Sequence, residues 1–162
     1  MTPGDSMIIA LEASALAGAM RTSPWLQPAI GFVHVLGFTL LAGSAAMFDL
    51  RLLGLSKQIS AVALARHLLP WSFGSLLLIV PSGLAMFVAH AGELVSSTTF
   101  VVKMCLLMAA GMNAAAFHAG VFQSVGQWEV DKPAPIAARL HAIASLVIWI
   151  SVLGCGRLLA TR

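Results

Sequence analysis

Four long apolar stretches, at residues 28–54, 65–91, 98–122 and 135–159, take up most of this 162-residue chain. An α-helix needs about 20 apolar residues to cross the hydrocarbon core of a bilayer, and each stretch is long enough to do so. Apolar residues make up 59% of the chain and charged residues 9%, too few polar groups to cover a soluble protein of this size. The sequence therefore predicts an all-α membrane protein with four transmembrane helices.

The connections between these stretches are short, and no segment outside them is long enough for a second domain. Helices with short connections pack as antiparallel neighbours. We expect residues 1–162 to form one domain, an antiparallel four-helix bundle with both termini on one side of the membrane, which we call side A. Side B is the opposite side. Small residues at helical spacing, such as Gly37 and Ser44 or Gly111 and Ala115, predict close contacts between the helices.

A shorter apolar segment, residues 7–20, precedes the first stretch. It is interrupted by Glu12 and is followed by the helix breakers Pro24 and Pro28. The segment is too short to cross a bilayer, so we expect an N-terminal interfacial helix that lies along the membrane surface on side A. Trp25 would anchor its end among the lipid headgroups.

Histidines lie inside or at the ends of all four stretches. His118, near the end of the third stretch, and His141, near the start of the fourth, share a level close to side B because their helices run in opposite directions. Two imidazoles that face each other across a bundle can hold the iron of haem b, so these two are the predicted axial pair. His67 lies near the same level. For each histidine taken alone, a packed or interfacial ring is the alternative.

A second polar layer is predicted near side A, with His34 from the first stretch, Lys103 from the third and Arg157 from the fourth. Cations at this depth need an anion, such as a haem propionate or a lipid phosphate, or a polar partner such as a quinone oxygen. His34 is the other candidate metal ligand. The alternative is that Lys103 and Arg157 extend to the headgroups.

Near side B, Asp49 and Arg51 together with Arg66 and Arg139 predict a structural charge network. Asn113, deep in the third stretch, is expected to hydrogen-bond to a neighbouring helix rather than face lipid.

Met104, Met108 and Met112 repeat along the third stretch, beside Cys105. Soft sulfur ligands suit Cu(I), so a copper path is one interpretation of this stripe. Packing of flexible side chains in the helical core is the other.

From Ser23 to Arg157 the pattern resembles an uncharacterised family of small bacterial four-helix membrane proteins, which is distantly similar to the copper-resistance D and di-haem cytochrome b membrane folds. The segments that carry the resemblance are Ser23-Pro24-Trp25, His34-Val35-Leu36-Gly37, Asp49-Leu50-Arg51-Leu52-Leu53-Gly54, Leu69-Pro70-Trp71, Phe100 with Lys103, Asn113, Trp149 and Gly156-Arg157-Leu158. The resemblance implies a multi-pass protein of the bacterial inner membrane.

The function predicted from these features is a membrane protein that binds haem b and transfers electrons, in exchange with quinone or a redox partner protein. No nucleophile with its base, carboxylate pair or phosphate-binding loop is visible, so the sequence favours a protein that is not an enzyme. No basic patch indicates nucleic acid as a partner. Two rival hypotheses stay open. The first is a structural or assembly subunit of a larger membrane complex or homo-oligomer, and the second is a copper or small-solute carrier.

Overall fold

In the computed structural model, residues 3–128 and 130–161 are described. Every regular element in these two ranges is helical: α1 (Pro3–Glu12), α2 (Ala15–Thr22), α3 (Leu26–Leu53), α4 (Ala61–Ala89), α5 (Ala91–Ser96), α6 (Thr98–Ala119), the 3-10 helix η1 (Val121–Gln127) and α7 (Ile136–Ala160). Four of the helices, α3, α4, α6 and α7, are long and apolar enough to cross a membrane. The prediction of an all-α membrane protein with four such helices is confirmed.

Local capping explains where the long helices begin and end. The Ser60 side chain accepts a hydrogen bond from the backbone N–H of Ala63 at 3.0 Å, so α4 begins at Ala61, ahead of the apolar stretch at residues 65–91. At the end of α3, Gly54 has a φ of 112°, a left-handed conformation that only glycine adopts readily. The first span therefore ends at Leu53, close to its predicted boundary.

Two segments differ from the sequence-based expectation. The third span ends at Ala119 rather than at residue 122, because Gly120 follows, and the chain continues as η1. The segment predicted as one interfacial helix forms two helices. Ser14 separates them, since its side chain accepts a hydrogen bond from the backbone N–H of Ala17 at 3.3 Å and caps α2.

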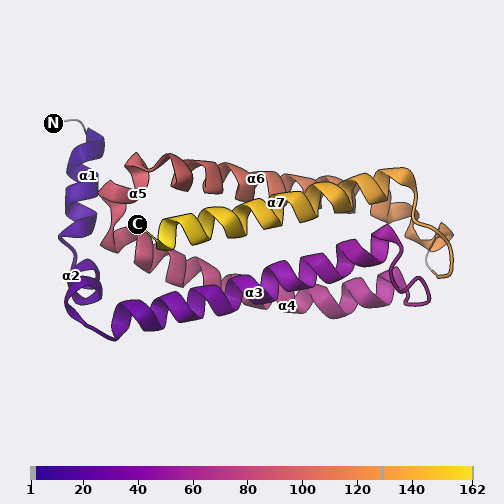
Figure 1. Ribbon diagram of the computed structural model, residues 1–162, viewed down its shortest axis with the longest axis horizontal. Coiled ribbons are helices and arrows are strands. Elements are labelled where there is room, and N and C mark those ends of the chain that lie inside the picture. The colour runs from indigo at the N-terminus through magenta and orange to yellow at the C-terminus, as the bar shows by residue number, and fades with distance from the viewer. Residues whose placement is uncertain (1–2, 129, 162) are drawn as a thin grey trace.

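The N-terminal pair α1 and α2 lies across one end of the bundle, and both ends of the described chain lie there too (Figure 1). Arg21 ties this pair together and to α4. Its guanidinium donates to the carbonyl oxygen of Glu12 at 2.6 Å and to that of Ala89 at 3.0 Å. The Glu12 side chain accepts a hydrogen bond from the backbone N–H of Gly92 at 2.8 Å, at the start of α5.

The four long helices lie side by side in a bundle but pack unequally (Figure 1). α3 packs against α4 on one side and against α7 on the other, and α6 packs against α7. α4 and α6 are joined through α5, and near that junction the rings of Phe87 and Phe100 stack with centroids 5.8 Å apart. Apart from this contact, the two helices approach each other much less than the other neighbouring pairs do. The bundle is therefore tightly packed between α4, α3, α7 and α6 in that order, and loosely packed between α4 and α6.

α3 and α4 approach each other closely at Gly37 on α3. A Cβ at this position would stand 2.9 Å from Leu78 Cβ and 3.1 Å from the carbonyl oxygen of Ser75, both on α4. The predicted close contact is confirmed here. At Gly111 on α6, a Cβ would meet nothing within 4 Å, so the prediction of close contact is wrong for that glycine.

Candidate functional site

Two cavities lie in the side-B half of the bundle and share the side chains of Phe48 and Asp49. The larger, of about 170 Å³, lies between α3, α4 and α6; its lining includes Phe48, Asp49, Leu68, Leu69, Ser72, Phe73 and His118. The smaller, of about 50 Å³, lies between α3, α6 and α7; its polar lining consists of Asp49, Asn113, His141 and Ser145. We call them the outer and the inner cavity.

Asp49 is the central residue of this region. Only 6% of its surface is exposed, and the Ser145 side chain of α7 is a polar neighbour of its carboxyl group in the inner cavity. One carboxyl oxygen, Oδ2, is buried and has no hydrogen-bond partner among the described residues. A buried polar atom left unsatisfied costs about 1–3 kcal/mol, and ionisable groups inside membrane spans are usually functional. The structure therefore makes Asp49 the leading candidate for a functional group.

The predicted charge network near side B is wrong for Asp49. Among the described residues no arginine bonds its carboxyl group, and its polar neighbour is Ser145. Arg51 points into the connection after α3, where it donates to the carbonyl oxygens of Ile59 and Lys57. The sequence alone could have identified Asp49 as a candidate, because no other acidic residue lies in any of the four spans.

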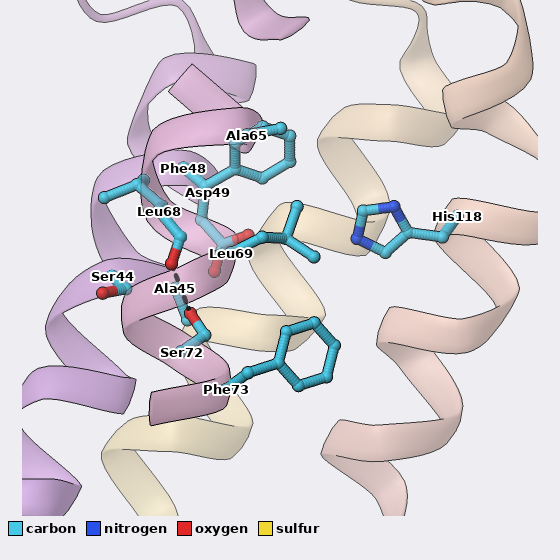
Figure 2. A pocket seen from close by; sticks show the side chains of 10 residues that line it. All are labelled: Ser44, Ala45, Phe48, Asp49, Ala65, Leu68, Leu69, Ser72, Phe73 and His118. Atoms are coloured by element: carbon cyan, nitrogen blue, oxygen red, sulfur yellow. Dashed lines mark hydrogen bonds between the residues drawn. The ribbon is translucent and has the colours of Figure 1, made fainter. Parts of the chain in front are cut away.

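His118 lies across the outer cavity from α3 and α4. Figure 2 shows its imidazole extending from α6 toward the wall that carries Asp49 and Leu69. The ring is held edge-on by two phenyl rings, with centroids 5.4 Å from that of Phe117 and 5.1 Å from that of Phe122. Its position is therefore fixed by aromatic packing rather than by a described hydrogen bond.

His141 is held by a polar partner on the neighbouring helix. The Asn113 amide nitrogen donates to the backbone carbonyl of His141 at 3.1 Å, which leaves Asn113 Oδ1 facing His141 Nδ1 at 2.7 Å. Because an amide oxygen only accepts, Nδ1 carries a proton and donates it in this hydrogen bond. The prediction that Asn113 joins two helices is confirmed.

The structure places His118 and His141, the predicted axial pair, at a similar depth in the bundle, but they line different cavities. His118 and His141 both contact the ring of Phe117, with centroid distances of 5.4 and 5.8 Å. However, His118 lines the outer cavity and His141 the inner one, and both cavities are smaller than the roughly 300–1,000 Å³ of typical cofactor sites. His67, on the exposed side of α4, lines neither. Haem ligation by these residues stays a prediction.

The side-A residues also approach one another. His34 Nδ1 lies 3.0 Å from Ser82 Oγ on α4, and its ring is 6.4 Å from that of Phe38. Lys103 Nζ lies 5.9 Å from the centroid of the same Phe38 ring, on the side of α6 and α7. Arg157 is exposed. His34 and Lys103 thus share Phe38 as a neighbour, and the anion predicted for this layer stays a prediction.

The methionine stripe lies on the outer face of α6. Met108 is 68% exposed and Met112 64%, so the prediction that these side chains fill the helical core is wrong for both. Among residues 3–128 and 130–161, no group of three or more His, Cys, Asp or Glu side chains has the arrangement of a metal site. The copper path stays a hypothesis without a structural observation in its favour.

Comparison with known proteins gives a family but no activity. Residues 12–161 match the model of a family of unknown function, DUF6644, and the chain therefore belongs to that family. No curated protein matches the chain, and no solved structure matches it either.

Proposed function

We propose that this member of DUF6644 is an electron-transport protein of the bacterial inner membrane that binds the ring of a quinone in the outer cavity. The observation that carries the proposal is the buried carboxyl group of Asp49, with one oxygen unpartnered among the described residues, in a cavity whose opposite wall is His118. A quinone ring carries oxygen atoms at opposite ends, so it matches polar groups on opposite walls.

The walls between these polar groups suit an aromatic ring. Phe48, Leu68, Leu69 and Phe73 supply apolar surface, and Ser72 is bonded to the Leu68 carbonyl within its own helix (Figure 2). Small-molecule sites commonly combine an apolar lining with a few polar groups that orient the ligand. A cavity of about 170 Å³ suits a ring rather than a whole lipid, and the loosely packed side between α4 and α6 gives the apolar tail a way into the bilayer.

The proposed setting is an antiparallel bundle that crosses the membrane, with α1 and α2 on the surface of side A. Both short helices lie across the end of the bundle and carry exposed apolar side chains, at Met7, Ile9 and Leu16 (Figure 1). Trp25 is 80% exposed at the junction with α3, where an aromatic anchor is favoured. These features support an interfacial arm.

Binding of a short-chain ubiquinone to the full chain in lipid nanodiscs tests the proposal, with empty nanodiscs as the blank. Leu69→Trp fills the outer cavity, whereas Leu84→Trp adds the same ring to an exposed position of α4 that lines neither cavity. We expect Leu69→Trp to weaken binding at least about tenfold and Leu84→Trp to change it less than about twofold. Equal binding by both variants, or no saturable binding above the blank, would overturn the proposal.

Haem b is a second candidate, favoured by the hydrogen bond between His141 and Asn113. Histidines that bind a metal usually donate their other ring nitrogen to an oxygen acceptor, as His141 Nδ1 does here. When bound, haem supplies a one-electron redox centre. The sizes of the two cavities speak against it, because the helices would have to separate to admit the macrocycle.

An absorption spectrum of the purified protein before and after dithionite tests for haem. If haem is bound by the predicted pair, His118→Ala and His141→Ala each remove the sharp reduced bands, and His90→Ala, at the junction of α4 and α5, leaves them unchanged. If His34→Ala alone removes them, the site lies near side A. No haem bands together with no quinone binding would favour the structural-subunit hypothesis.

A further inference from the structure

Asp49 separates the outer cavity from the inner one. It lines both, and Ser145, a polar neighbour of its carboxyl group, lines the inner cavity only. Oδ2 has no partner among the described residues although it is fully buried. A carboxyl group in this position is within reach of whatever occupies either space.

The inner cavity has the size and polarity to hold water. Its volume of about 50 Å³ exceeds the 10–15 Å³ or so that one water molecule requires. Asp49, Ser145, Asn113 and His141 supply polar groups in its lining, and a buried water usually makes about three hydrogen bonds. Cavities that stay dry are lined by apolar groups alone, so this one is expected to be hydrated.

The groups that face Asp49 across the two cavities are ionisable on α6 and α7 but not on α4. His118 of α6 lines the outer cavity, and His141 of α7 lines the inner one. The lining residues of α4 are Ala65, Leu68, Leu69, Ser72 and Phe73. The carboxyl group therefore lies between two spaces that each contain one imidazole.

From this arrangement we propose that Asp49 carries protons between the outer cavity and water in the inner cavity. In one direction, a hydroxyl group in the outer cavity gives its proton to the Asp49 carboxylate, and the carboxylic acid then gives a proton to the oxygen of an inner-cavity water. The carboxylate is restored and no electron moves. This proposal deepens the proposed function and rests on it only for the identity of the molecule in the outer cavity.

The test measures hydrogen–deuterium exchange of the Asp49 carboxyl group by infrared spectroscopy, without quinone and across a pH series. The carboxylic-acid band is assigned by its loss in Asp49→Asn. Leu69→Trp closes the outer cavity, and Ser145→Val then removes the hydroxyl group and part of the space in the inner one. Ser151→Val on α7 is the matched control, since Ser151 lines neither cavity.

In the Leu69→Trp variant, we expect the Asp49 carboxyl group to exchange its proton at a rate within about twofold of the wild-type rate, because water in the inner cavity still reaches it. Adding Ser145→Val should slow exchange at least about tenfold, and adding Ser151→Val instead should have no such effect. Circular dichroism and gel filtration check folding, and Ser145→Ala replaces Ser145→Val if the valine variant does not fold.

Two results would overturn the proposal. If Leu69→Trp alone stops the exchange, protons reach Asp49 only from the outer cavity. If exchange in the double variant is as fast as in the wild-type protein, the inner cavity is not the route. Because no quinone is present, these outcomes are separate from the success or failure of the quinone-binding experiment.

Discussion

The two sides of α4 differ sharply, although both lie within the same apolar helix. Toward α3 the helices are in close contact, with only the missing side chain of Gly37 leaving room for Leu78 and Ser75. Toward α6 the backbones approach far less closely: Phe87 and Phe100 stack near the α5 end, and the outer cavity lies nearer side B. In a membrane, helices associate closely where small residues let their backbones approach. The polar groups of the candidate site lie on the side where this contact is missing.

The same contrast separates two histidines. His34 lies in the tightly packed region, where Ser82 bonds its Nδ1 and its Cε1 stands 3.1 Å from the place of a Cβ on Gly83. His118 lies in the loosely packed region and faces a cavity. Packing around the ring, rather than depth in the membrane, therefore distinguishes a histidine that joins helices from one that is available to a ligand.

Disrupting the contact between α3 and α4 should have the largest effect on the unfolding free energy. In Gly37→Leu the new side chain would overlap Leu78 Cβ and the Ser75 carbonyl, neither of which can move away cheaply. Overpacking of this kind costs about 3 kcal/mol of unfolding free energy. Gly43→Leu is the control, since a Cβ there meets nothing within 4 Å. Thermal unfolding followed by circular dichroism should show a large loss for the first variant only; equal losses would contradict the close contact.

Replacing the buried carboxyl group should have the next largest effect, in the opposite direction. Asp49→Leu removes an unsatisfied buried oxygen and adds apolar volume beside the cavities. We expect a gain of about 2 kcal/mol in the unfolding free energy, together with loss of quinone binding. The same unfolding and binding assays measure both. A less stable Asp49→Leu protein would show that the carboxyl group holds the fold together rather than serving a ligand.

Removing the hydrogen bonds between α6 and α7 should have a smaller effect on the unfolding free energy. Asn113→Leu removes two hydrogen bonds to His141. Hydrogen bonds between transmembrane helices average about 0.6 kcal/mol, so a loss of about 1 kcal/mol follows for the pair. Because α6 packs against α4 much less than against α7, the variant should also expose the outer cavity more. In a His118→Cys background, faster modification of the introduced thiol would reveal this, and an unchanged rate would argue against it.

The smallest effect is expected from Ser82→Ala on the tightly packed side. The hydroxyl group of Ser82 donates to the Leu78 carbonyl of its own helix and accepts from His34. Its removal leaves the close helix contact at Gly37 intact, so the unfolding free energy should fall by only about 0.5 kcal/mol. A loss as large as that of Gly37→Leu would mean that polar contacts, and not the small residue, close this side.

The sequence was sufficient for the helices and for the depth of their polar residues. The length of each apolar stretch predicted the four spans, and residue counts along them placed His118 and His141 at one level, where both contact Phe117. The hydrogen-bonding role of Asn113 also followed from its position deep in an apolar helix. These features depend only on composition and on the rise per residue of a helix.

The sequence did not predict which way each side chain faces around its helix. The four spans are apolar on all sides, so no polar stripe indicates the buried face. As a result, the two histidines were expected to face each other but line different cavities, and Asp49 was assigned to an arginine network rather than to the cavity wall. Rotation about a helix axis depends on packing with its neighbours, which a single sequence does not display.

The contacts of Arg21 have a consequence for the order in which the chain is assembled. The carbonyl group of Ala89 and the N–H of Gly92, which bind Arg21 and Glu12, come from the end of α4 and the start of α5. During synthesis the N-terminal arm is made before α4 and α5, so these two contacts can form only after the second span has been made. Formation of the Arg21 and Glu12 contacts therefore follows completion of the α3–α4 pair.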